Sequence, residues 1–153
     1  DYTQVKDNVT RTSFENFTVI ANWSIHDAFD LDGMVLPPQG MWIQKNDGTI
    51  QAGIYTSYNG TALSPGEHYL IEERQKDKIV VRQPSGANTS LTLKLLPGWN
   101  GKSLLKAQAF SRDGALIYST PVAVSASGAT FTYTQDIPGS AQVVDYYEIT
   151  TGK

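Results

Sequence analysis

Three aspartates and a glycine stand close together in the first quarter of the chain. Asp27, Asp30 and Asp32 precede Gly33. Alternating carboxylates that converge on a hard cation, with a glycine that permits the turn, are typical of calcium loops. Apolar residues interrupt the pattern here, and no distal glutamate follows. The spacing therefore leaves two alternatives, a calcium site or a turn whose carboxylates are solvated. Calcium is the one cofactor that we consider.

Residues for acid–base or nucleophilic chemistry are few. His26 lies beside Asp27 and could form half of a catalytic dyad. The second histidine, His68, is about forty residues away, and no G-x-S-x-G elbow or phosphate loop is present. Both histidines fit strand-edge or turn positions. A carboxylate pair for glycoside hydrolysis would be spatial rather than sequential, and its strand-borne candidates are Glu67, Glu72, Glu73 and Glu148. We expect a non-catalytic protein.

Aromatic residues near turns are the clearest candidates for ligand binding. Trp99 lies within the turn "PGWNG", and Tyr55 and Tyr58 flank the approach to "YNG". An exposed aromatic ring can stack on the apolar C–H face of a sugar. Packing in the core is the alternative for each ring, and we expect it for Trp23 and Trp42, which lie in predicted strands.

Possible sites of covalent modification point to the cell exterior. Sequons for N-glycosylation occur at Asn8, Asn16, Asn22, Asn59 and Asn88. The alternative is that asparagine and threonine are frequent around β-turns. The chain has no cysteine, which excludes disulfides and favours a bacterial or archaeal surface protein over a disulfide-rich eukaryotic one. Lys94 and Lys106 could donate isopeptide crosslinks or could face solvent.

Composition limits the partners of the chain. Of 153 residues, 40% are apolar and 18% are charged, and the net charge is −3. This composition is typical of a folded domain. The sequence has no cluster of lysine and arginine, so it does not favour nucleic acid as a partner. Its apolar runs are too short for a membrane span.

These residues must be positioned by short β-strands. From Phe17 to Ile25, alternation predicts a core face made by Phe17, Val19, Ala21, Trp23 and Ile25. In "SLTLKLL", alternation places Leu91, Leu93 and Leu95 on one face, and Thr92 and Lys94 on the other. Turn sequences predict three hairpins, at residues 45–48, 74–77 and 111–114.

Turn signals recur at short intervals, and no segment has the periodicity of a helix. About ten short strands at this spacing predict an antiparallel β-sandwich, with a barrel as the alternative. We expect a flexible lead or donor strand over residues 1–16 and a single domain over residues 17–153.

Two resemblances support this prediction. "GKSLLKAQAFSRDGALIYSTPVAVS" and "PGEHYLIEE" resemble strands of immunoglobulin-like modules in prokaryotic surface proteins. "FTVIANWSIHDAFDLDGMVLP" resembles the first strand and loop of cysteine-free chaperone-usher pilins, although the glycine-tyrosine terminal strand of those pilins is not found. The first resemblance implies that the β-sandwich of about ten short strands is immunoglobulin-like. Both imply a surface location, and neither brings catalytic residues.

The favoured function is therefore a structural or adhesive protein at the cell surface. It could form filaments with neighbouring subunits, each subunit donating a strand from residues 4–20 to the next. A carbohydrate-binding module, with glycans as partners, is the alternative. A small secreted glycan-active enzyme is the third hypothesis.

Overall fold

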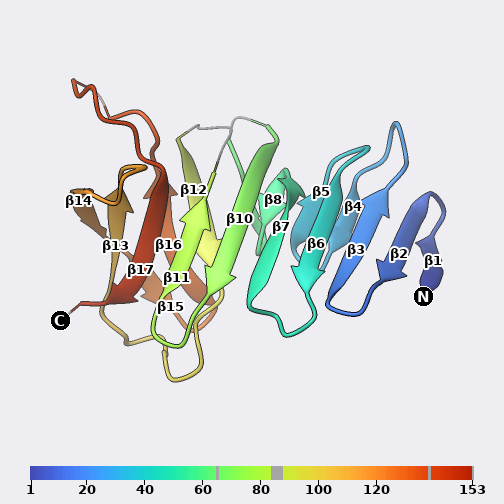
Figure 1. Cartoon of the computed structure of the whole chain (residues 1–153), viewed down its shortest axis with the longest axis horizontal. Helices are drawn as coiled ribbons and strands as arrows, with labels where there is room; N and C mark the ends of the chain where they lie inside the picture. The colour runs from blue at the N-terminus through green and yellow to red at the C-terminus, as the bar shows by residue number, and fades with distance from the viewer. Residues whose placement is uncertain (65, 84–87, 138, 153) are drawn as a thin grey trace.

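A long antiparallel sheet of ten strands dominates the computed structural model, which describes residues 1–64, 66–83, 88–137 and 139–152. The strands lie side by side, with β1 at one edge and β14 at the other (Figure 1). In spatial order they are β1 (Tyr2–Lys6), β2 (Val9–Ser13), β3 (Phe17–Asn22), β6 (Met41–Lys45), β7 (Ile50–Tyr55), β10 (His68–Arg74), β11 (Ile79–Arg82), β17 (Tyr146–Thr151), β13 (Leu105–Phe110) and β14 (Leu116–Pro121).

Two smaller antiparallel sheets cover one face of the long sheet (Figure 1). One contains β4 (Phe29–Leu31), β5 (Met34–Leu36), β8 (Ser57–Tyr58) and β9 (Thr61–Ala62). The other contains β12 (Thr89–Leu93), β16 (Gly128–Tyr133) and β15 (Ala123–Ser125). We call the covered face of the long sheet its inner face and the opposite face its outer face.

A single core lies between the layers. It contains buried side chains from Val9 on β2 to Ile149 on β17. Its aromatic centre joins the three-stranded sheet to the long sheet, because Tyr147 packs against Phe131 and Tyr133 with ring centroids 5.1 and 4.6 Å apart. Burial of such rings is a major part of the hydrophobic free energy of folding.

The three predicted hairpins are confirmed. Antiparallel pairing joins β6 to β7, β10 to β11 and β13 to β14. Leu91 and Leu93 on β12 are buried and Lys94 is exposed, as the alternation predicts.

The predicted face of β3 is wrong. Thr18, Ile20 and Asn22 are the buried residues of this strand, and Phe17 is exposed. Trp23, which we expected in the core, has 66% of its surface exposed. The polar residues can face inward because they find partners there, and the apolar ones face outward because the outer face is itself apolar in this region.

Residues 1–16 do not form an unpaired lead in this structure. β1 and β2 pair with each other, and β2 pairs with β3. Val9 belongs to the core and is 2% exposed. The N-terminal strands therefore complete the edge of their own sheet.

The all-β, antiparallel class is confirmed, whereas the strand count was too low, since the described residues contain seventeen strands. Three open sheets replace the expected two-sheet sandwich. The described residues contain no helix, and hence none that could cross a membrane. Pro65, at the start of "PGEHYLIEE", lies outside the described residues.

Candidate functional site

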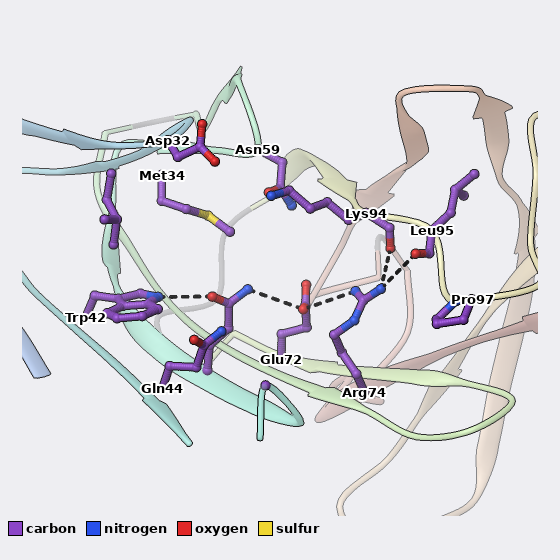
Figure 2. Close-up of a pocket in the computed structure, with 13 residues that line it drawn as sticks. Asp32, Met34, Trp42, Gln44, Asn59, Glu72, Arg74, Lys94, Leu95 and Pro97 are labelled. Atoms are coloured by element: carbon purple, nitrogen blue, oxygen red, sulfur yellow. Dashed lines mark hydrogen bonds and ion pairs between the residues drawn. The ribbon is translucent and has the colours of Figure 1, made fainter. Parts of the chain in front are cut away.

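A cleft of about 520 Å³, lined by both apolar and polar side chains, opens between the inner face of the long sheet and the loops and strands that cover it (Figure 2). This volume lies within the range of small-molecule sites. Strands β6, β7 and β10 supply the floor of the cleft. The turns that carry Asp32 and Asn59 lie on one side, and Lys94, Leu95 and Pro97 lie on another (Figure 2).

Strand register places the floor residues on one face. Gln51 on β7 pairs with Gln44 on β6 and with Glu72 on β10. Residues two apart on a strand share a face, so Trp42 and Arg74 join the same group. The floor is thus a continuous polar surface across three neighbouring strands.

A chain of hydrogen bonds fixes the floor side chains (Figure 2). Trp42 Nε1 donates to Gln51 Oε1 at 3.0 Å. Because an indole N–H can only donate, the Gln51 amide is oriented, and its Nε2 donates to the Tyr58 hydroxyl at 2.9 Å. Tyr58 donates in turn to Glu72 Oε1 at 3.0 Å.

An ion pair completes the network. One guanidinium nitrogen of Arg74 lies 3.3 Å from Oε2 of Glu72. The other donates to the backbone carbonyls of Lys94 and Leu95, both at 3.0 Å. Glu72 is 2% exposed. A buried carboxylate is tolerated when it is paired and hydrogen-bonded, and Glu72 meets both conditions.

Two buried tyrosines feel the negative charge of Glu72. Burial raises the pKa of Tyr58 well above its usual value of 10.0, and the negative charge of Glu72 raises it further. Burial and the same carboxylate raise the pKa of Tyr55 in the same direction. The two rings pack edge to face, with centroids 4.9 Å apart. Tyr58 is therefore a fixed, protonated donor at neutral pH.

Several polar groups of the cleft have no partner within the described chain. The side chains of Gln44, Asp32 and Lys94 make no hydrogen bond or ion pair there. Oδ1 of Asn59 is buried without a partner, while its Nδ2 donates to the carbonyl of Thr92 at 2.8 Å. A buried acceptor without a protein partner is unusual and indicates a bound water or ligand.

The cleft has balanced charge and mixed hydrogen-bonding capacity. Glu72 and Asp32 carry the negative charges, and Arg74 and Lys94 carry the positive ones. The free groups include both donors and acceptors. Among the described residues, no cluster of three or more His, Asp or Glu side chains could hold a metal ion. The arrangement favours binding of a neutral polar ligand.

The geometry removes the basis of the calcium interpretation. Asp32 and Gly33 form a two-residue turn between β4 and β5, with φ values of 52° and 91°. Positive φ at both positions defines a type I′ hairpin. Asp30 Oδ1 accepts from the Gly33 N–H at 2.8 Å, and Asp27 lines a different hollow beside Asn8. Among the described residues, the three aspartates do not form a group that could hold a metal ion.

The predicted aromatic face is wrong in two of its three members. Tyr55 and Tyr58 are 0% and 1% exposed, so neither ring can stack on a ligand. Trp99 is half-buried against the core and lines a separate hollow. Trp42, which we assigned to the core, is half-buried and lines the cleft.

The predicted catalytic candidates lie apart. His26 is exposed, whereas His68 is buried, with its Nδ1 2.7 Å from the Gln83 amide. Of the glutamates, Glu72 alone lines the cleft. Glu73 and Glu148 lie on the outer face, and Glu67 is exposed ahead of β10. Lys106 lies on the outer face of β13, far from Lys94 at the rim of the cleft.

The sequons fall into two groups. Asn8, Asn16 and Asn88 are exposed. Asn59 is half-buried, in the type I′ turn between β8 and β9. Asn22 is 2% exposed, and its Nδ2 donates to the carbonyls of Asp27 and Pro37 at 2.8 and 3.1 Å. A glycan would leave this nitrogen one hydrogen for two bonds, so Asn22 does not fit as a glycosylation site in the folded protein.

Sequence reasoning missed most of the cleft. It named Glu72 as one of four strand-borne carboxylates, and it named Asp32, Asn59 and Lys94 for other roles. It did not single out Trp42, Gln44, Gln51 or Arg74. One pattern in the sequence could have indicated the cleft. Polar residues occupy every second position on the strands that flank the predicted hairpins, and such residues share one face of a sheet.

Comparison of the chain with protein-family models, with curated proteins and with solved structures finds no match in any of the three.

Proposed function

We propose that this protein is a non-catalytic adhesive module of the cell surface and that its cleft binds a neutral saccharide. The observation that carries the proposal is the set of unpartnered polar groups, Gln44, Asp32, Lys94 and Asn59 Oδ1, beside the hydrogen-bonded floor network of Trp42, Gln51, Glu72 and Arg74. Such a floor is rigid before a ligand arrives, which lowers the entropic cost of binding.

A saccharide suits this cleft for two reasons. Its hydroxyl groups both donate and accept, so they can pair with the Gln44 amide, the Asp32 carboxylate and the Lys94 ammonium. Its C–H faces suit the indole of Trp42 and the apolar wall formed by Leu95 and Pro97. A ligand with a net charge gains little electrostatic binding free energy, because the cleft contains equal numbers of positive and negative side chains.

The bonding of Glu72 supports binding over catalysis. Its two oxygens are occupied by Tyr58, Gln51 and Arg74. A general base must reach the proton that it takes, and a carboxylate enclosed by three donors is poorly placed to do so. Hydrolysis of a saccharide is the outcome that would contradict this part of the proposal.

The surface location rests on the exposed sequons Asn8, Asn16 and Asn88, on the absence of cysteine and on the resemblance of Gly101–Ser125 to immunoglobulin-like surface modules. Filament formation by strand donation is a second hypothesis. It requires β1 and β2 to leave their own sheet, and deletion of residues 1–16 followed by electron microscopy of the native protein tests it.

Binding can be tested with a glycan array followed by calorimetry on the best saccharide. We expect Gln44→Ala and Trp42→Ala each to raise Kd about tenfold or more, the effect of losing one hydrogen bond or one stacking contact. Gln108→Ala, on the outer face of β13, is the matched control and should bind as the wild type does. A melting curve for each variant confirms that it is folded.

Trp99→Ala separates this cleft from the neighbouring hollow. Unchanged affinity in this variant supports the cleft, whereas loss of binding in Trp99→Ala with normal binding in Gln44→Ala would place the ligand at the loop. A broad array without a single bound saccharide would overturn the proposed function.

A further inference from the structure

The outer face of the long sheet carries an apolar surface, and no strand of the two smaller sheets packs on it within the described residues. We define the outer patch by its members on three adjacent strands: Met41 and Ile43 on β6, Ile50, Ala52 and Ile54 on β7, and Tyr69 and Ile71 on β10. Met41 is 46% exposed, Ile50 39% and Ile71 36%. Sheet faces that meet water normally carry polar side chains, so this patch indicates an interface.

Strand register arranges the patch in rows. In one row, Val19, Ile43, Ala52 and Ile71 are successive cross-strand partners on β3, β6, β7 and β10. In the row above, Ala21 pairs with Met41, and Ile54 pairs with Tyr69. Both rows are apolar over four strands.

The opposite half of the outer face carries charged side chains that are paired with one another. The guanidinium of Arg82 lies 4.6 Å from the ring centroid of Tyr146, which stacks on Phe110 at 5.1 Å. Arg82 also pairs with Asp145 at 2.7 Å, and Lys78 pairs with Glu148 at 3.1 Å. The apolar patch is therefore a bounded feature of one half of the sheet.

Charges of both signs border the patch in a third row. Lys45 on β6 pairs with Phe17, and Glu73 on β10 pairs with Ile50. β6 and β10 are the two neighbours of β7 in the sheet. Lys45 and Glu73 consequently stand on either side of Ile50, at the same height along the strands.

We propose that the outer patch binds a second copy of this chain, related by a twofold axis that runs parallel to β7 between the two sheets. This rotation keeps the height along the strands and exchanges the two sides of β7. It therefore places Lys45 of each copy opposite Glu73 of the other. Ile43 of each copy meets Ile71 of the other in the apolar row.

The size of the contact suits a weak, reversible dimer. The two apolar rows span four strands, and four strands spaced about 4.8 Å apart and about 17 Å long cover roughly 330 Å² per copy. A standard interface buries about 800 Å² per partner, so we expect the copies to associate only at high protein concentration.

The edges of the sheet are less suited to association than the face. Pairing of β1 with β2 is irregular between Gln4 and Lys6. The other edge strand, β14, ends in Pro121, and its pairing with β13 is irregular at Ala109 and Phe110. Bulges, lysine and proline at edges are known to discourage strand addition.

The two binding clefts would lie on the far sides of the dimer, because each cleft opens on the inner face of its own sheet. The dimer is inferred independently of the saccharide. If both hold, the pair would be bivalent, and avidity for a glycan surface would exceed the affinity of one cleft.

Sedimentation equilibrium of the whole chain tests the dimer. We expect a concentration-dependent monomer–dimer equilibrium for the wild type. Lys45→Glu alone and Glu73→Lys alone should each weaken dimerisation at least tenfold, because each places like charges opposite each other. The double variant should restore the wild-type dissociation constant within about threefold. Ser119→Lys, on the outer face of β14, is the control and should leave it unchanged.

Ile71→Lys, with circular dichroism to confirm the fold, tests the apolar row and should give a monomer. A wild-type chain that remains monomeric at millimolar concentration would overturn the proposal. A dimer that is insensitive to Ile71→Lys, or a double variant without rescue, would overturn the twofold arrangement. A monomer that still binds saccharide would leave the proposed function in place.

Discussion

The hydroxyl of Tyr58 donates to Oε1 of Glu72 across 3.0 Å, and both side chains are buried. Tyr58 comes from the four-stranded sheet and Glu72 from the long sheet. This bond therefore joins two layers of the fold at the floor of the cleft. The position of Glu72 is fixed by both layers, and its partners are set before a ligand binds.

Removal of the charge on Glu72 should weaken the protein. In Glu72→Gln the ion pair with Arg74 is lost, while the two carbonyl acceptors of Arg74 remain. We expect the free energy of unfolding to fall by about 1–3 kcal/mol. Urea denaturation measures it. The exposed Glu67→Gln is the control, with an expected change of about 0.5 kcal/mol or less; equal effects of the two variants would contradict a structural role for the pair.

Alkaline pH should unfold the protein through its buried tyrosines. Burial raises the pKa of Tyr133 to about 12, and it raises the pKa values of Tyr55, Tyr58 and Tyr147 as well. The unfolded chain loses these protons near pH 10, whereas the folded chain keeps them. Stability is therefore complete below pH 10 and falls as pH rises toward 12, by about 1.4 kcal/mol per pH unit for each such tyrosine.

Denaturation midpoints measured at several pH values between 8 and 12 check this dependence. The free energy of unfolding of Tyr133→Phe should fall less steeply between pH 10 and 12 than that of the wild type, because the variant lacks one of the phenol groups that lose a proton on unfolding. Constant stability up to pH 12 would show that these phenols ionise without unfolding the chain.

Gly53 should resist substitution because of its neighbour Tyr55. A Cβ at residue 53 would lie 2.7 Å from the Tyr55 hydroxyl and 2.7 Å from the carbonyl oxygen of Met41. Tyr55 is fully buried and cannot move aside. We expect Gly53→Ala to reduce the free energy of unfolding by about 1–3 kcal/mol. Gly152→Ala, whose Cβ would make ordinary contacts, is the matched control; a neutral Gly53→Ala would contradict the tight packing.

The parts of the fold that follow local rules could be predicted from the sequence. The hairpin at residues 111–114 depends on an Asp-Gly turn between alternating strands, and such turns act over a few residues. The leucine face of β12 follows from alternation, since one side of that strand meets the core and the other does not.

The face of β3 could not be predicted because both sides of this strand carry apolar residues. Alternation favoured Phe17, Val19 and Ala21, yet these lie on the outer face, beside the outer patch. The inner face accepts Thr18 because its hydroxyl donates to Asn46 at 2.9 Å. Long-range pairing decided the orientation. The cleft has the same origin, because Trp42, Gln51 and Glu72 meet only through sheet register.

Asn22 offers a last test of the orientation of β3. If β3 has the observed face inward, Asn22→Ala removes the donor for the carbonyls of Asp27 and Pro37, and the free energy of unfolding should fall by about 2 kcal/mol. Asn88→Ala, at an exposed sequon, should have almost no effect. Expression through a glycosylating secretory pathway extends the test, since glycopeptide mass spectrometry of the folded product should find glycans at Asn8, Asn16 or Asn88 and none at Asn22. A folded product that carries a glycan on Asn22 would contradict the inward orientation, because the modified nitrogen cannot make both bonds.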